Sequence, residues 1–331
     1  MRCTTPTSGR WKRSEPTLRL TLSRLVQALV VLLLVSAITF FLVNAAPGGP
    51  SALMRIDATP EQRDALVRRF GLDRPVPLRY LDWLASAARG DLGTSLLTQE
   101  PVTTRIGDRL PNTLLLGGVA LAASIALGIP MGVIAALHRG TAPDYVLSAV
   151  SLLGLSIPAF WLGIMLILAL SVNLQLLPSS GVISTGSTGG PLDRLQHLIL
   201  PSLVLSTAVL PYVVRFTRSA MLEVLSQDYV RTATAKGLAR QTVIYGHALR
   251  NAMVPIASII GTLIPRLAGG AVVTEAVFGW PGMGRLAVEA ANGRDYPLIV
   301  GITVVIAAIV IVSSFVVDVA YTWIDPRIRL A

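Results

Sequence analysis

Long stretches without a charged residue are the feature that most restricts how this chain can fold. A helix of about 20 apolar residues is long enough to cross the hydrocarbon core of a bilayer. The 30 residues between Arg24 and Arg55 carry no charge, and comparable stretches recur along the chain. The first could instead be a signal peptide, but its apolar run exceeds the usual length of about 7–15 residues. Together the stretches predict six membrane-spanning helices, at about 25–46, 112–137, 146–172, 197–215, 252–274 and 298–320.

The composition supports a membrane protein and excludes several other classes. Charged residues make up 14% of the chain, against roughly 25% in soluble domains. Hydrophobic residues make up 53%, which is too much for a disordered chain and more than a soluble fold could hide from water. Cys3 is the single cysteine, so disulfide frameworks and cysteine-based metal clusters are excluded. Three histidines argue against a structural zinc site.

The positions of lysine and arginine predict how the chain sits in the membrane. Six of them precede the first span, six lie between the fourth and fifth spans, and only Arg194 lies between the third and fourth. Cytoplasmic loops carry the excess of Lys and Arg, so both termini are predicted to be cytoplasmic. The net charge of +10 is assigned to membrane borders and anionic lipid head groups, not to nucleic acid. We divide the chain into a cytoplasmic segment (1–24), a first transmembrane helix (25–46), an extracytoplasmic helical loop (47–111), a five-helix core (112–320) with a cytoplasmic loop (216–251), and a cytoplasmic tail (321–331).

Helix signals predict that the outer loop is structured. Thr59-Pro60-Glu61 combines a capping hydroxyl, a proline at the first helical position and an acid, and it predicts a helix that ends at Gly71. A second helix is predicted at Leu78–Arg89. These helices could cover a gate, or they could form a packed cap without contact to any ligand. Trp280 and Tyr296 are predicted at the outer membrane interface, where aromatic residues gather.

Motifs for catalysis and nucleotide binding are absent or lack their structural context. The chain has no G-x-x-x-x-G-K-[ST] loop for ATP. Gly282–Ala287 matches the letters of a dinucleotide fingerprint, but it follows Trp280-Pro281 and not a strand. Ion-coupled transporters usually bury acids, whereas Glu275 and Asp318 fall at span ends. We therefore expect no catalytic, cofactor or metal site on this chain, and a secondary transporter or an intramembrane enzyme stays as an alternative.

Two patterns inside the spans have more than one explanation. Gly128 and Gly132 form a G-x-x-x-G pattern that permits close helix approach, although Pro130 between them could instead kink the helix. Arg215 and Arg218, at the inner end of the fourth span, are predicted to extend toward the lipid head groups.

Arg266 is a charge inside the fifth predicted span. At about 1.5 Å per residue it lies roughly 22 Å along the helix from Asn251, in the outer half of the membrane. A charge at such a depth usually faces a cavity or a partner. Arg266 could attract a substrate carboxylate, pair with a partner subunit, or extend to the outer surface. Pro265 and Gly269-Gly270 predict that this helix is interrupted.

The strongest functional signal lies in the cytoplasmic loop between the fourth and fifth spans. Residues 217–236 contain good helix formers, and Gly237 predicts where that helix ends. A second short helix is predicted at about 240–250. Two helices that meet at a glycine would form a compact knob able to transmit a push from a cytoplasmic partner.

Six motifs follow one another in a fixed order over nearly the whole chain. They are PGGP (47–50), GLDRPVPLRYLDW (71–83), GDLGTSL (90–96), DYVRTATAKGL with HALRNAMVP (228–238 and 247–255), TEAVFGWPGMGRL (274–286) and DPRIR (325–329). This order resembles that of permease subunits of binding-protein-dependent ABC importers, in the dipeptide/oligopeptide/nickel subfamily. Gly49 stands where relatives usually have an acid. The general Glu-Ala-Ala-x-x-x-Gly pattern is matched only at Ala233 and Gly237, because Arg231 and Thr232 replace its first two residues.

The resemblance implies an all-α membrane protein with six transmembrane helices, the type I ABC importer permease fold and a cytoplasmic coupling-helix loop. It implies that residues about 229–250 insert into a groove on an ATPase. Ala233 would allow close packing and Gly237 the turn, while Arg231 and Lys236 would be polar contacts or, alternatively, a solvated helix face. The residues assigned to the coupling loop are Tyr229, Arg231, Thr232, Ala233, Lys236, Gly237 and Leu238.

The resemblance also implies the partners and the substrates. A second homologous permease would complete the pathway in the bacterial inner membrane, and a substrate-binding protein would deliver substrate from outside. Two ABC ATPase subunits would use ATP and Mg²⁺, so this chain would bind no cofactor and would not be an enzyme. Dipeptides or oligopeptides are the expected substrates, with nickel chelates, opines or glutathione as alternatives.

Overall fold

The computed structural model describes residues 15–46, 73–184, 186 and 189–324, excepting the side chains of 15–23, 268–270 and 318–324. All regular elements in this part of the chain are helices, apart from one isolated β-bridge between Thr94 and Pro101. The all-α fold is therefore confirmed. The motifs at 47–50 and 325–329, the helix predicted at 59–71 and the side chain of Asp318 lie outside the described residues.

Six helical units are long and apolar enough to cross a membrane when each bent helix pair is taken as one span. Four are single helical runs: Arg24–Ala45 in α1 (Glu15–Ala45), α4 (Val102–Leu137), Thr242–Leu267 through η3 (Thr242–Leu249) and α10 (Arg250–Val277), and Tyr296–Val317 in α12 (Tyr296–Ile324). Two are bent pairs: α5 (Ala142–Ser156) with α6 and η2 (Ala159–Leu166 and Ile167–Asn173), and α7 (Pro191–Ser206) with α8 (Leu210–Leu225).

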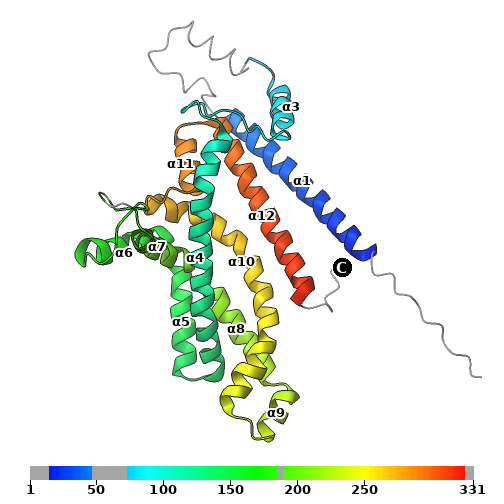
Figure 1. The fold of residues 1–331 in the computed structure, drawn as a ribbon, viewed down its shortest axis with the longest axis vertical. Coiled ribbons are helices and arrows are strands. Elements are labelled where there is room, and N and C mark those ends of the chain that lie inside the picture. Colours follow the sequence, from blue (N-terminus) through cyan, green and yellow to red (C-terminus); the bar gives the residue numbers. More distant parts are fainter. Residues whose placement is uncertain (1–14, 47–72, 185, 187–188, 325–331) are drawn as a thin grey trace, which may run out of the picture.

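The third and fourth spans are each divided into two helical parts, whereas the apolar stretches predicted one helix for each. The third bends by 102° between Ser156 and Ala159, and Figure 1 shows α6 turned away from α5. Pro158 has no N–H to donate and forces Ile157 into an extended conformation (φ −89°, ψ 126°), so α5 must end there. The fourth span bends by 59° between Ser206 and Leu210.

The fifth span is more continuous than the sequence predicted. α10 is one helix from Arg250 to Val277, although it contains Pro255, Pro265 and Gly269-Gly270. A single proline removes one backbone hydrogen bond, and packing against neighbouring helices can hold the helix together across that gap. Gly261 makes such packing possible, because a Cβ at this position would lie 2.2 Å from Cγ1 of Val317 in α12.

α4 is the central helix, and it lies against α5, α7, α8, α10 and α12. Its closest neighbour is α8, which approaches at the two glycines of the G-x-x-x-G pattern. A Cβ on Gly128 would lie 2.8 Å from Cγ1 of Val213, and one on Gly132 would lie 2.7 Å from the carbonyl oxygen of Val214. These distances favour close helix approach as the explanation of the pattern, and α4 is one helix across Pro130.

A buried carboxylate closes the outer end of the molecule. Glu275 in α10 is fully buried. Its Oε1 accepts a hydrogen bond from the hydroxyl of Thr113 in α4 (2.7 Å), and its Oε2 accepts from the backbone N–H groups of Gly284 (2.6 Å) and Arg285 (3.0 Å). The carboxylate thus caps the N-terminus of α11 (Met283–Asn292), where free N–H groups and the helix dipole favour a negative charge.

The chain between α10 and α11 folds inward over this carboxylate. Trp280 is completely buried and donates from Nε1 to the carbonyl oxygen of Asn112 (3.0 Å). Tyr296 retains only 7% exposure. The prediction that both aromatic rings lie at the outer lipid interface is therefore wrong, because both are buried within the chain: Trp280 in the packed turn formed by TEAVFGWPGMGRL, and Tyr296 at the beginning of α12.

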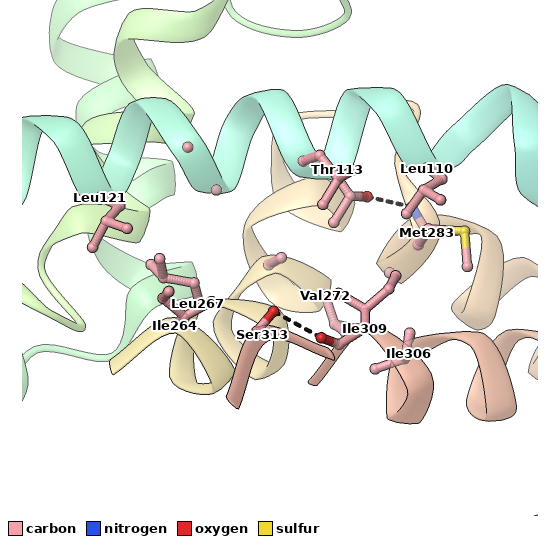
Figure 2. Close-up of a pocket in the computed structure, with 15 residues that line it drawn as sticks. Leu110, Thr113, Leu121, Ile264, Leu267, Val272, Met283, Ile306, Ile309 and Ser313 are labelled. Atoms are coloured by element: carbon pink, nitrogen blue, oxygen red, sulfur yellow. Dashed lines mark hydrogen bonds between the residues drawn. The ribbon is translucent and has the colours of Figure 1, made fainter. Parts of the chain in front are cut away.

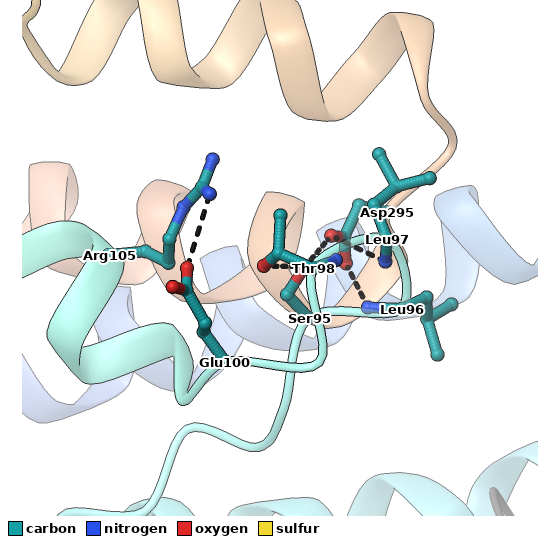
Figure 3. A network of polar contacts seen from close by, with 7 residues as sticks. All are labelled: Ser95, Leu96, Leu97, Thr98, Glu100, Arg105 and Asp295. Atoms are coloured by element: carbon teal, nitrogen blue, oxygen red, sulfur yellow. Dashed lines mark hydrogen bonds and ion pairs between the residues drawn. The ribbon is translucent and has the colours of Figure 1, made fainter.

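A second buried carboxylate fixes the outer loop to the last span (Figure 3). Asp295 accepts hydrogen bonds from the hydroxyl of Ser95 and from the N–H of Leu96 (3.1 Å), both in the GDLGTSL motif. Asp295 also precedes α12 and accepts from the N–H of Leu298 (3.4 Å), which caps that helix.

The outer loop contains the predicted second helix, as α3 (Val76–Ala87). The hydroxyl of Tyr80 lies 3.0 Å from Oγ of Ser36 in α1, and the rings of Tyr80 and Trp83 pack against Phe40 of α1. Figure 1 shows α3 at the outer end of α1, whose own length lies against α12.

We expect the two glycines facing α8 to be intolerant of a methyl group. Gly132→Ala should destabilise the protein by about 1–3 kcal/mol, because the new Cβ meets a backbone carbonyl that cannot retreat. Gly107→Ala, in the same helix but with open space around its Cβ, is the control and should not lower stability. Thermal unfolding of the detergent-purified protein would measure both, and equal melting temperatures would contradict the close-packing explanation.

Candidate functional site

The loop between the fourth and fifth helical units forms the knob that the sequence predicts, with one more break than expected. The predicted helix 217–236 is interrupted: α8 ends at Leu225, Gln227 is extended (φ −76°, ψ 149°), and α9 (Asp228–Ala235) begins after it. The hydroxyl of Ser226 donates to the carbonyl oxygen of Glu223 (2.7 Å), a local bond that competes with helix continuation. Figure 1 shows α9 at one end of the molecule, beyond the ends of α8 and α10.

Gly237 ends α9, as predicted. Its φ is +77°, a left-handed conformation that glycine adopts at low cost. The turn lets the N–H of Gly237 bond to the carbonyl oxygen of Thr234 (3.0 Å), while the N–H of Leu238 reaches that of Ala233 (3.4 Å). No atom lies within 4 Å of a Cβ built on Gly237. The backbone conformation, and not crowding, is therefore what requires glycine here.

The inner face of α9 packs within the chain. Val230 and Ala233 are buried against Val243 of η3, and Val224 and Leu225 of α8 pack against the same cluster. The small side chain of Ala233 thus allows α9 to approach its own neighbour. After this turn η3 continues into α10 without a break, so the second predicted helix of the knob is the beginning of the fifth span.

The outer face of α9 and its turn are open to solvent. The side chain of Arg231 is 78% exposed and lies 3.9 Å from the carboxylate of Asp228, which is itself 98% exposed. Tyr229 accepts a hydrogen bond at its hydroxyl from Nδ2 of Asn251 (2.9 Å), which ties α9 to α10. The remaining predicted residues on this exposed face are Thr232, Lys236 and Leu238.

An ion pair that the sequence analysis missed holds α8 beside the knob. Arg218 contacts Asp144 with two hydrogen bonds, from Nε to Oδ1 (2.6 Å) and from Nη2 to Oδ2 (2.7 Å). Asp144 lies in the first turn of α5, is 5% exposed at its side chain, and also accepts from the N–H of Gly140 (2.9 Å). The prediction that Arg218 extends to the head groups is wrong, because a buried carboxylate lies within its reach.

Arg266 lies on the face shared by α8 and α10. Its guanidinium donates from Nη1 to the hydroxyl of Tyr212 in α8 (3.0 Å) and lies over the ring, 4.5 Å from the centroid. Arg266 remains exposed in spite of this contact. Below it, the same two helices form a groove of about 450 Å³, lined by Phe216, Ser219, Ala220, Glu223, Val254, Pro255, Ser258 and Ile259.

A second cavity lies between α4, α10 and α12 (Figure 2). Its volume is about 240 Å³, and its lining, which includes Leu121, Leu267 and Ile309, is almost entirely apolar. The hydroxyl of Thr113 at its edge is already engaged, because it donates to Glu275 and accepts from the N–H of Met283 (2.7 Å). This cavity therefore offers packing space without polar chemistry. Among the described residues, no group of three or more His, Cys, Asp or Glu side chains could hold a metal ion.

Comparisons with known proteins agree over nearly the whole chain. Residues 128–330 match the family described as binding-protein-dependent transport system inner membrane component, and residues 17–117 match the N-terminal component of such systems. The oligopeptide transport system permease protein AppB of Bacillus subtilis (strain 168) is 42% identical over 309 residues, which are 92% of this chain and 98% of that protein. The dipeptide transport system permease protein DppB of Escherichia coli (strain K12) is 40% identical over 318 residues, 89% of this chain and 94% of that protein.

A solved structure shares the fold. The inward-facing MetNI methionine ABC transporter superposes with a TM-score of 0.55 at 18% identity, covering 66% of this chain and 96% of the solved chain. The match supports the same helical architecture over that part.

We expect the left-handed turn at Gly237 to control the local stability of α9. Gly237→Val should speed hydrogen exchange at the amides of α9 roughly tenfold, because a β-branched residue at φ +77° is strained. Gly237→Asn is the matched control, since asparagine tolerates this conformation. Exchange measured by mass spectrometry should separate the two variants, and identical rates would show that the turn does not limit α9.

Proposed function

The chain belongs to the family of binding-protein-dependent transport system inner membrane components, and from this membership we propose that it is a permease subunit of an ATP-driven importer of peptides. The observation that carries the proposal is the identity of 42% and 40%, over almost the full length, to permeases named for oligopeptide and dipeptide transport. Nickel chelates, opines and glutathione stay as alternative cargo. The buried acids Glu275 and Asp295 accept hydrogen bonds from backbone N–H groups at the beginnings of α11 and α12, so they do not support an ion-coupled transporter.

The proposal assigns the other functions of the transport complex to partner subunits. A second homologous permease would form the other half of the pathway, two ABC ATPases would bind the cytoplasmic side, and an extracytoplasmic binding protein would deliver substrate. Both termini would be cytoplasmic, in agreement with the concentration of Lys and Arg before the first span and around the knob. The stretch 47–111, with α3, would then face the binding protein.

The knob is proposed as the surface that an ATPase contacts. Its outer face offers Tyr229, Arg231, Thr232, Lys236 and Leu238 to a partner, whereas Ala233 supports the knob from inside. Charged residues at such a rim control which partner binds and how fast it does so.

The geometry supports a simple route from ATPase to pathway. α8 enters the knob and α10 leaves it, and the same two helices carry the groove and Arg266. A push on the knob would therefore change the spacing of the two helices that line the groove. The Asp144–Arg218 pair would pass the same displacement to α5. We propose Arg266 as a residue of the pathway on this basis.

Affinity purification from the native membrane tests the proposed function. A second permease and an ATPase should be recovered with this chain, and the reconstituted complex should take up peptide only when ATP and the binding protein are present. Uptake by this chain alone, driven by an ion gradient, would contradict the proposal and support a secondary transporter.

We expect the exposed charges of α9 to hold the ATPase. The double variant Arg231→Glu/Lys236→Glu should lower recovery of the ATPase about tenfold, because it reverses two charges on the proposed contact surface. Arg89→Glu, an exposed charge reversal in the outer loop, is the control and should leave recovery unchanged. If both variants retain the ATPase equally, these charges form a solvated face and not a contact.

A further inference from the structure

Polar side chains line up along the face that α8 and α10 share. On α8 they recur at intervals of seven and four residues, and on α10 at intervals of four. A helix of 3.6 residues per turn places each set on one side. The groove between these two sides is open and is partly lined by the same hydroxyl and carboxyl groups. The α8 set is Tyr212, Ser219 and Glu223, and the α10 set is Ser258, Thr262 and Arg266.

This polar stripe has a positive end and a negative end. Arg266, held by Tyr212, lies at the outer end, and Glu223 lies two residues before α8 ends at the knob. Among the described residues no acid pairs with Arg266 and no base pairs with Glu223. Arg218, on the same helix as Glu223, differs in that it is paired with Asp144. A charge inside a membrane-spanning segment is costly and usually marks a substrate pathway, and this argument applies to Arg266. Glu223 lies at the knob end of α8 and is exposed, so it is open to a ligand that enters the groove from that end.

The hydroxyls between the two charges add hydrogen-bonding capacity without charge. Ser258 donates to the carbonyl oxygen of Val254 (3.1 Å), and Thr262 donates to that of Ile259 (2.7 Å). Each hydroxyl oxygen keeps acceptor capacity for another donor, such as a peptide N–H. The groove therefore presents acceptors along its length between one cation and one anion.

We propose that the α8–α10 groove recognises peptides with two free termini, with Arg266 contacting the carboxylate and Glu223 the ammonium group. The inference rests on the proposed function and names the part of the substrate that this site reads. Tyr212 and Glu223 are eleven residues apart, or about 16 Å along α8. An extended peptide of about five residues spans that distance at roughly 3.3–3.6 Å per residue.

Tyr212 is a positioning residue in this arrangement. Its ring and hydroxyl hold the guanidinium in one orientation, which leaves the remaining N–H donors of Arg266 free for a carboxylate. Arginine suits this task because its planar fork matches two carboxylate oxygens.

Charge-selective labelling of introduced thiols tests the groove directly. In a Cys3→Ser background, which removes the only native cysteine, Thr262→Cys places a thiol one turn from Arg266, and Ser219→Cys places one a turn from Glu223. The assembled complex is treated with anionic and cationic methanethiosulfonate reagents. Met221→Cys, fully buried in the same helix as Ser219, is the unreactive control.

We expect opposite preferences at the two ends. The anionic reagent should react about threefold faster or more at the Thr262→Cys thiol, and the cationic reagent should do so at the Ser219→Cys thiol. Adding Arg266→Gln or Glu223→Gln should abolish the corresponding preference, and tetra-alanine with binding protein and ATP should slow both reactions. Equal rates for the two reagents, no protection by peptide, or unreactive thiols covered by the second permease or by lipid would each overturn the proposal.

Uptake measurements separate this inference from the proposed function. In the reconstituted complex, Arg266→Gln and Glu223→Gln should each lower kcat/KM for tetra-alanine at least about tenfold, as expected when a charged hydrogen bond is lost. Arg215→Gln removes a charge from the side of α8 that faces α5, and it should not lower kcat/KM. If the wild-type complex imports no peptide, the proposed function itself fails. If it imports peptide and the variants match wild type, only the recognition of charged ends fails.

Discussion

The hydrogen bonds of one buried carboxylate, Glu275, set the geometry of the outer half of the molecule. A charge cannot be buried without partners, and Glu275 obtains its partners from α4 and from the beginning of α11. The requirement fixes how far α10 can slide along α4 and where the chain must turn back after Phe278. The same arrangement requires glycine at positions 282 and 284, because a Cβ on Gly282 or Gly284 would collide with Glu275 itself or with the backbone of Val272. Asp295 likewise fixes the position of the outer loop relative to α12, because it accepts hydrogen bonds from Ser95 and Leu96.

The inner half is held together differently. The knob has a small core of Val230, Ala233 and Val243, and its outer residues are solvated. One bidentate ion pair, Asp144–Arg218, joins α8 to α5 near the knob. Buried hydrogen bonds hold one end of the helices in place, whereas the knob at the other end is only lightly packed. This combination suits the transmission of movement from the knob along the helices. A force on the knob would act on α8 and α10 as levers, because helices are stiff and their outer ends are restrained.

The sequence could predict the elements because the bilayer leaves few choices. Charge-free stretches located the helical units that number six when each bent pair is counted as one span, and Gly237 located the end of α9. Both follow from local rules on hydropathy and backbone conformation. The bend at Pro158 has a local cause that a search for long apolar stretches overlooks. Other errors arose from contacts distant in sequence. Arg218 finds Asp144 across 74 residues, and Trp280 reaches the carbonyl of Asn112 across 168 residues. The four-residue spacing of Ser258, Thr262 and Arg266 indicates a polar stripe on α10, but no local rule assigns its partner stripe on α8 to the same groove.

The sequence by itself therefore determined the class of protein, the positions of its long apolar segments and the family to which the chain belongs. Hydropathy, charge and motif order are properties of single segments, and the membrane converts them into structure one helix at a time. Only the tertiary structure decided which carboxylates are buried, which charges are paired and which face of α8 meets which face of α10. Those outcomes depend on how two helices rotate and slide against each other. Close contacts, such as that of Gly132 with Val214, fix this relative position.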